Sequence, residues 1–245
     1  MAVADTMYTQ RVYNDLRASP VITLKNFYLK VYHLPDVNCA TVHNLWFAAY
    51  DNNIGIDQSG AMAAESVTGP PDCAVQLSMV VSPMRGHGLP VGAGVGARHR
   101  ATGILNAGAT AANLWVTEKQ TGCTVLIVDW GAGQYSMTHL QPSDDTQFNQ
   151  AGRALMGASD FARNAYKNIW LKKEMTSVIG NTGGAPQRYI MIQSMFETYS
   201  RTDTQIIGIR NGAQFTFYRQ RDAATLLVEQ LQWSTWYSYL PYFSY

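Results

Sequence analysis

Eight stretches of this chain either alternate apolar and polar side chains or consist of β-branched and aromatic residues, and turn-forming residues border each of them. A period of two is typical of β-strands, so these stretches predict strands. A chain built in this way is constrained to fold mainly as sheets. The predicted strands are Val21–Tyr32, Ala74–Val81, Cys123–Asp129, Gln134–His139, Arg188–Gln193, Gln205–Arg210, Ala213–Tyr218 and Leu226–Trp233.

The dipeptide Asn211-Gly212 separates two of these stretches and is the clearest hairpin signal in the chain. A type I′ turn needs two residues that tolerate positive φ, and Asn followed by Gly meets that need. We therefore expect Gln205–Arg210 and Ala213–Tyr218 to pair as an antiparallel hairpin.

Helical periodicity is confined to the middle of the sequence. Apolar residues recur at helical spacing between about Asp145 and Met175, whereas Pro83–Gly108 is rich in glycine and has no sustained period. A length of 245 residues fits one domain, residues 1–245. The predicted fold class is α+β, with a mixed or antiparallel β-sheet sandwich and helices packed on the outside.

The charge balance excludes several classes of partner. Eighteen Lys and Arg against seventeen Asp and Glu give a net charge of +1, so no bulk field draws the protein to nucleic acid or to an anionic membrane. The longest uncharged stretches, 101–117 and 230–245, contain polar residues and fall short of the roughly 20 apolar residues that span a bilayer. We therefore expect neither nucleic-acid binding nor membrane insertion. The first twenty residues show no Sec signal, so we expect any secretion to use another route.

Cysteine and histidine spacing argues against a bound metal. Cys39, Cys73 and Cys123 are odd in number and form no C-x-x-C motif, which disfavours a disulfide framework and a zinc site. The five histidines include no pair at i, i+4. We expect no cofactor and no metal, with Cys39 and Cys73 as packing residues.

The segment 117–139 contains two predicted strands joined at Trp130–Gly133. A symmetric turn centred on Gly131 sets Cys123 directly opposite His139, and such pairs hold their Cβ atoms about 4.5–5.5 Å apart. A thiol beside an imidazole is a typical nucleophile, because the imidazole takes the thiol proton and later protonates the leaving nitrogen. Gly122 allows close backbone approach to a substrate, and the Cys123 N–H is suited to an oxyanion hole.

The same two residues also have a purely structural interpretation. Free cysteine is among the most buried residue types, so Cys123 is equally compatible with packing at a strand start, and His139 with a hydrogen-bonded strand end. Neither face of the predicted hairpin is fully polar, as expected for a strand pair covered on both sides. The residues alone therefore leave two interpretations open, a cysteine-dependent enzyme and a non-catalytic β-rich interaction module.

The motif Thr121-Gly122-Cys123, followed sixteen residues later by His139, resembles the Leu-Ser-Gly-Cys motif of a family of glutamine deamidase toxins. This family contains the catalytic domain of cytotoxic necrotizing factor and Burkholderia lethal factor. Burkholderia lethal factor uses a threonine six residues before its cysteine, where this chain has Thr117. The hairpin at Asn211-Gly212 and the aromatic tail also resemble the end of that toxin.

This resemblance implies a deamidase-toxin-like fold with Cys123 as nucleophile, His139 as base and Thr117 as the residue whose oxygen orients the histidine. It implies an enzyme that converts a glutamine of a folded host protein to glutamate without a cofactor. It further implies a secreted monomer, a virulence effector that acts in the host-cell cytoplasm. A cysteine protease and a transglutaminase, which use the same Cys-His pair, remain the alternatives.

A local basic cluster stands out in this nearly neutral chain. Arg85, His87, Arg98, His99 and Arg100 lie close together in sequence. Such a cluster is suited to an acidic target surface, and a solvated loop explains it equally well.

Overall fold

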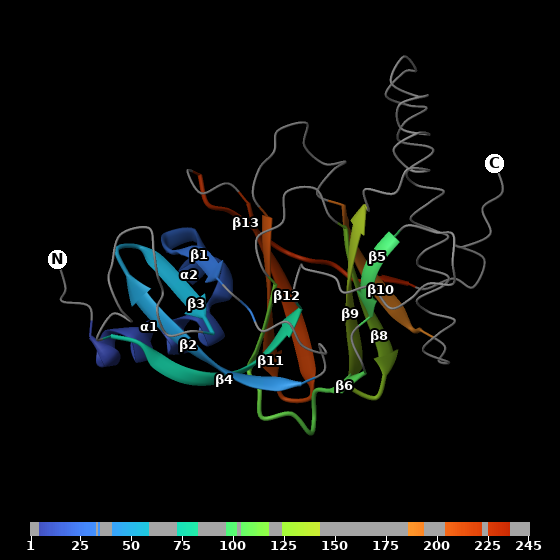
Figure 1. Ribbon diagram of the computed structural model, residues 1–245, viewed down its shortest axis with the longest axis horizontal. Coiled ribbons are helices and arrows are strands. Elements are labelled where there is room, and N and C mark those ends of the chain that lie inside the picture. Colours follow the sequence, from blue (N-terminus) through green and yellow to red (C-terminus); the bar gives the residue numbers. More distant parts are fainter. Residues whose placement is uncertain are drawn as a thin grey trace, which may run out of the picture.

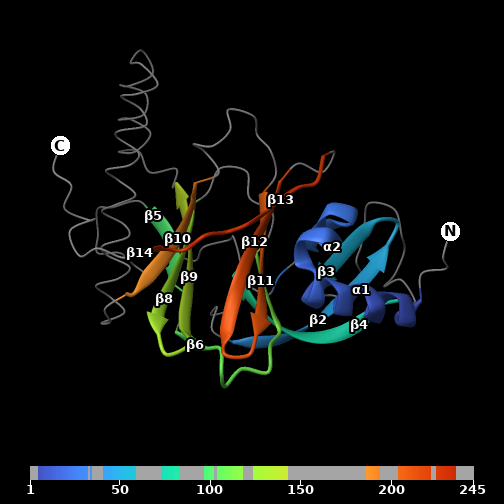
Figure 2. The same ribbon diagram turned by 180° about the vertical axis from the view of Figure 1, so that it is seen from behind.

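The computed structural model describes residues 5–32, 34, 41–58, 73–82, 97–101, 104–117, 124–142, 186–193, 204–221 and 225–235 (Figure 1). Within these ranges the chain forms two helices and fourteen strands. The strands make two sheets that pack face to face, and the helices cover the outer face of the larger sheet (Figure 2). The fold is therefore α+β, a sheet sandwich with helices on its outside, as the sequence predicts.

The larger sheet has eight strands in the order β1-β3-β2-β4-β7-β11-β12-β13. Its neighbours are antiparallel except for the pairs β1–β3 and β4–β7, which are parallel, so the sheet is mixed. The strands are β1 (Tyr28–Tyr32), β2 (Val42–Tyr50), β3 (Asn53–Asp57), β4 (Val75–Ser82), β7 (Leu114–Thr117), β11 (Thr204–Asn211), β12 (Gln214–Arg221) and β13 (Leu227–Gln230).

The smaller sheet follows the order β14-β10-β8-β9-β5, and β6 pairs with β9 as well. All its pairs are antiparallel. The strands are β5 (Ala97–Ala101), β6 (Leu105–Asn106), β8 (Thr124–Gly131), β9 (Gln134–Pro142), β10 (Arg188–Gln193) and β14 (Ser234–Thr235).

The amino-terminal helices are α1 (Thr6–Ala18) and α2 (Pro20–Asn26). The Asp5 side chain accepts a hydrogen bond from the backbone N–H of Tyr8 and so caps the first turn of α1. The prediction of one strand over Val21–Tyr32 is wrong for its first part, which forms α2. A helix of only seven residues is too short for its apolar pattern to be distinguished from that of a strand. Pro20, in the first turn, was the available signal of a helix start.

Several strands fall outside the predicted set, among them β2, β3 and β7. Pro83–Gly108, expected to be irregular, contains β5 and β6. The turn between β2 and β3 did carry a signal, since Asp51 and Asn52 have φ values of 43° and 59°, and both residue types tolerate positive φ. The predicted helical region from Asp145 to Met175 lies outside the described residues.

The predicted hairpin around Asn211-Gly212 is confirmed, with a different turn. Asn211 pairs with Gln214, so the two-residue loop is Gly212-Ala213. Gly212 has a φ of +61°, and Ala213 is not among the residues with positive φ. Glycine at the first loop position is typical of a type II′ turn, whereas the sequence had predicted type I′.

The space between the two sheets is filled by an aromatic cluster over Gly208. The strand register sets Gly208 of β11 between Trp115 of β7 and Phe217 of β12. The two rings lie 6.1 Å apart between centroids, and Phe215 packs edge-on against Trp115 at 5.6 Å. A Cβ at position 208 would lie 2.6 Å from Cε1 of Phe217 and 3.2 Å from Cβ of Trp115. The absence of a side chain therefore lets both rings pack over β11.

The opposite face of the larger sheet packs against the helices, where one buried glutamine links distant segments. Nε2 of Gln220 donates to the carbonyls of Leu24 (2.6 Å) and Phe27 (2.7 Å), and its Oε1 accepts from the backbone N–H of Leu29 (2.7 Å). These bonds join the end of α2 and the start of β1 to β12, across the sequence.

Gly208→Ala tests the packing of the aromatic cluster. We expect the substitution to lower the free energy of unfolding by about 1–3 kcal/mol, because Phe217 or the strand must shift to admit the methyl group. Chemical denaturation measures the change. Gly108→Ala is the matched control, since its Cβ would meet no atom closer than Asn106 Oδ1 at 3.3 Å. Equal stability of the two variants would contradict this account of the core.

Candidate active site

The sandwich has two unlike ends. At the lower end in Figure 1, the loops of the β8–β9 and β11–β12 hairpins meet: the backbones of Gly133 and Ala213 approach closely, and Tyr135 packs edge-on against Phe215. The other ends of these strands lie together at the opposite end, which we call the upper end. There β4, β7 and β9 end, and β8 and β11 begin.

Polar residues form a row across the larger sheet at the upper end. The register aligns Ser82 with Thr117, and Arg219 with both Ile206 and Glu229. The hydroxyl of Thr117 accepts a hydrogen bond from the Ile206 N–H at 3.3 Å, which joins the two halves of the row. Alternation sets this row on the face turned toward the smaller sheet, because Trp115 and Phe217, two residues earlier in their strands, belong to the core between the sheets. The apolar core between the sheets therefore ends at this row of polar residues.

Thr117 is part of this polar row and is almost completely buried, with 1% of its surface exposed. Next to it, Nε1 of Trp115 donates to Oγ of Ser82 at 2.9 Å, so the last apolar ring and the polar row are directly connected. The predicted site residue is thus held by hydrogen bonding at the end of β7, on the inner face of the larger sheet.

His139 occupies β9 in the facing sheet, and its Cα partners are Val125 of β8 and Arg100 of β5. Directly opposed residues of an antiparallel pair share a face. Val125 belongs to the core between the sheets, so His139 holds a position on the inner face. Thr117 and His139 therefore come from different sheets to facing sides of the same end of the sandwich.

The predicted direct pairing of Cys123 with His139 is wrong, because Val125 is the partner of His139. The loop is Ala132-Gly133, later in the chain than a symmetric turn at Gly131 assumes, and the irregularity between Asp129 and Gly131 then moves the ladder back by one residue. The net displacement is two residues, which preserves the faces. Four residues of this face belong to the core between the sheets: Val125, Ile127, Tyr135 and Met137.

Cys123 and the side chain of His139 lie outside the described residues. The structure does show that β8 begins at Thr124, the residue that directly follows Cys123. Of the other two cysteines, Cys39 lies outside the described residues and Cys73 is fully buried against Ala48, as expected of a packing residue.

Asp129 fixes the irregular turn that sets this register. Its Oδ1 accepts from the Gly131 N–H at 2.8 Å, and its Oδ2 forms an ion pair with Nε of Arg188 at 2.7 Å. Nε1 of Trp130 donates to Oγ of Ser136 across the strands at 2.8 Å. Burial raises the pKa of the neighbouring Tyr135 above its ordinary value, and the Asp129 carboxylate adds to the rise, so this phenol stays protonated at neutral pH.

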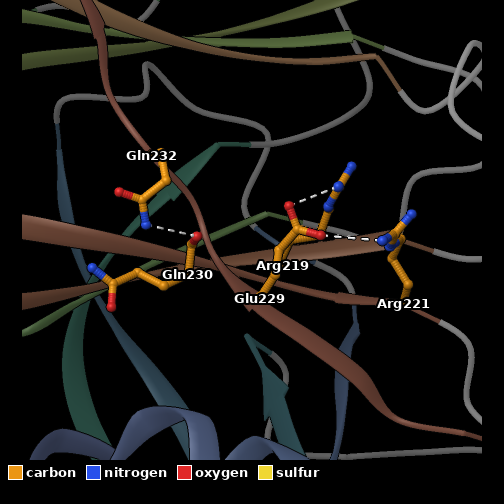
Figure 3. Close-up of polar contacts among 5 residues, drawn as sticks. All are labelled: Arg219, Arg221, Glu229, Gln230 and Gln232. Atoms are coloured by element: carbon orange, nitrogen blue, oxygen red, sulfur yellow. Dashed lines mark hydrogen bonds and ion pairs between the residues drawn. The ribbon is translucent and has the colours of Figure 1, made fainter.

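A pair of arginines at the upper end was missed from the sequence. Nη2 of Arg219 lies 2.8 Å from Oε1 of Glu229, and Nη2 of Arg221 lies 3.1 Å from Oε2 of the same carboxylate (Figure 3). The available signal was two arginines at alternate positions of one strand, which share a face.

No protein-family model matches this chain, and no curated protein shows a significant match to it. Within the described ranges, no helix is long and apolar enough to cross a membrane. Those ranges also hold no group of three or more His, Cys, Asp or Glu residues able to bind a metal ion.

Substitutions at Asp129 test its control of the turn. We expect Asp129→Ala to reduce the free energy of unfolding by about 1–3 kcal/mol, because it removes both the hydrogen bond to Gly131 and the ion pair. Asp129→Asn keeps an oxygen for Gly131 and should lose less. Hydrogen exchange of the β8 and β9 amides reports the local effect, with the exposed Asp15→Ala on α1 as the control for loss of one charge. A loss confined to global stability, without faster exchange near the turn, would contradict a local role.

Proposed function

We propose that this protein is a cysteine-dependent glutamine deamidase, a secreted toxin that acts on a folded protein in the host-cell cytoplasm. The observation that carries the proposal is the position of Thr117 and His139 on facing sides of one end of the sandwich. They are 22 residues apart in sequence (139 − 117) and belong to different sheets.

Cys123 precedes Val125, the strand partner of His139, by two residues in the sequence. The proposal therefore requires the thiol and the imidazole to meet without the direct pairing that a symmetric turn would give.

The proposed reaction proceeds through a thioester. His139 accepts the thiol proton, and the Cys123 sulfur attacks the side-chain carbonyl carbon of glutamine to form a C–S bond. The C–N bond breaks as His139 returns the proton to the departing nitrogen, which leaves as ammonia. Water, deprotonated by His139, then attacks the thioester; the C–S bond breaks, and glutamate and the thiol are released. No oxidant, reductant or cofactor is consumed.

The reaction and its target can be identified together. Lysate proteins from host cells are incubated with the wild-type protein or with Cys123→Ser, digested and mapped by mass spectrometry. Deamidation appears as a gain of about 1 Da at one glutamine, with the wild-type protein only. Cleavage of a target would instead indicate a protease, and a larger adduct at glutamine a transglutaminase.

Variants of the proposed pair separate catalysis from folding. We expect Cys123→Ser and His139→Ala each to abolish deamidation, because the first lacks a thiolate and the second leaves a thiol with a pKa near its ordinary value of about 8.5. Thermal unfolding should show nearly unchanged midpoints. Activity in either folded variant would reject the mechanism. Unfolding of Cys123→Ser would instead favour a buried structural cysteine, as in a non-catalytic interaction module.

Thr117 can be tested by removing its hydroxyl without changing its shape. Thr117→Val leaves the Ile206 N–H without its acceptor, so we expect a loss of about 1–2 kcal/mol in stability. If the hydroxyl also orients His139, kcat falls at a temperature where the variant is folded, and the pH profile of kcat/KM shifts. Thr117→Ser keeps the hydroxyl and should retain both properties. Full activity of folded Thr117→Val would show that this side-chain oxygen does not orient the base.

A further inference from the structure

Charged residues are unevenly distributed over the strands of the sandwich. Within the described strands β4 to β14, arginines outnumber acidic residues by six to two. At the lower end Asp129 pairs with Arg188, and Arg210 donates to the carbonyls of the neighbouring loop. The remaining charged strand residues belong to the upper end: Arg98, Arg100, Arg219, Arg221 and Glu229.

One pair of arginines comes from the larger sheet. Arg219 and Arg221 alternate along β12, so both lie on the face that carries Phe217 and turns toward the smaller sheet. Figure 3 shows their guanidinium groups directed at the single carboxylate of Glu229. The Arg219 side chain is 6% exposed, whereas those of Arg221 and Glu229 are 25% and 42% exposed. The charged side chains on the larger sheet are therefore partly exposed to solvent.

The second pair comes from the smaller sheet. In the register of β5 with β9, Arg100 is opposite His139 and Arg98 is opposite Gln141. Opposed residues share a face, so both arginines hold positions on the face of His139. The described strands thus bring two arginines from each sheet to facing sides of the upper end, around the proposed base.

From this juxtaposition we infer that the deamidase prefers a glutamine carried by an acidic, extended segment of its target protein. The inference rests on the proposed function and names its substrate class. An extended chain that crosses the upper end of the sandwich would have one pair of arginines on either side, each on the wall that its sheet forms. Carboxylates beside the glutamine would pair with guanidinium groups on either wall, while the glutamine amide reaches His139.

Nucleic acid is the less suitable polyanion. Its affinity depends on many phosphate contacts over an extended basic surface, and this chain has a net charge of only +1. A local cluster of four arginines with a single carboxylate, Glu229, is better suited to a short acidic peptide.

The test measures binding without turnover, on full-length Cys123→Ser protein. Two fluorescein-labelled peptides carry a central glutamine flanked on each side by two glutamates or by two serines. We expect the acidic peptide to bind about tenfold more tightly, and added NaCl to reduce this preference. Arg98→Gln/Arg100→Gln, made in the same background, should remove most of the preference, and Arg221→Gln should reduce it. Lys25→Gln on α2, an exposed charge on the helical side, is the matched control and should preserve it.

Each outcome decides the inference. Equal affinity for the two peptides, no binding of either at millimolar concentration, or equal effects of the arginine and Lys25 variants would overturn it. Tighter binding of a labelled oligouridine, lost in the same arginine variants, would also overturn it and assign the arginines to nucleic acid. Because binding needs no catalysis, these results are independent of the lysate experiment, in which failure of the proposed function appears as the absence of any converted glutamine.

Discussion

The contact between the two sheets depends on one strand position that has no side chain. Gly208 lies between Trp115 and Phe217, and both rings occupy the volume that any larger residue would fill. Close packing between sheets requires complementary large and small residues, and here the smallest residue in the row faces the two largest. The aromatic cluster in turn supports the polar row directly above it, through the bond from Trp115 to Ser82. The inner position of Thr117 follows from this packing.

In the smaller sheet, the strand register depends on the turn at Asp129, which is distant from His139. Asp129 holds the irregular turn at the lower end, and every residue pair along β8 and β9 follows from where that turn begins. A change of one residue there would exchange the two faces of the following strand. The position of His139 on the inner face is thus determined near Asp129, ten residues earlier in the chain.

The sequence predicts best where one local signal decides the structure. The Asn211-Gly212 dipeptide required a turn, and the alternation along β8 and β9 identified both segments as strands. Prediction failed where signals were short or nonlocal: seven residues of α2 resemble a strand, and the register of His139 depended on an irregularity that spacing alone does not reveal. The sequence does not reveal the relation of the β12 arginines to His139, because this relation exists only after the two sheets have packed. Periodicity identifies faces, whereas registers and contacts between sheets require tertiary structure.

The buried side chain of Gln220 has a consequence for how the protein is made. Its partners Leu24, Phe27 and Leu29 lie more than 190 residues earlier in the sequence. A ribosome therefore releases the amino-terminal helices long before the strand that satisfies their backbone groups exists. Contacts of such long sequence separation form slowly, because the intervening chain must be ordered before they contribute stability. During synthesis the apolar face of α2 remains without β12, so the chain stays exposed to chaperones and proteases until nearly all of it has emerged.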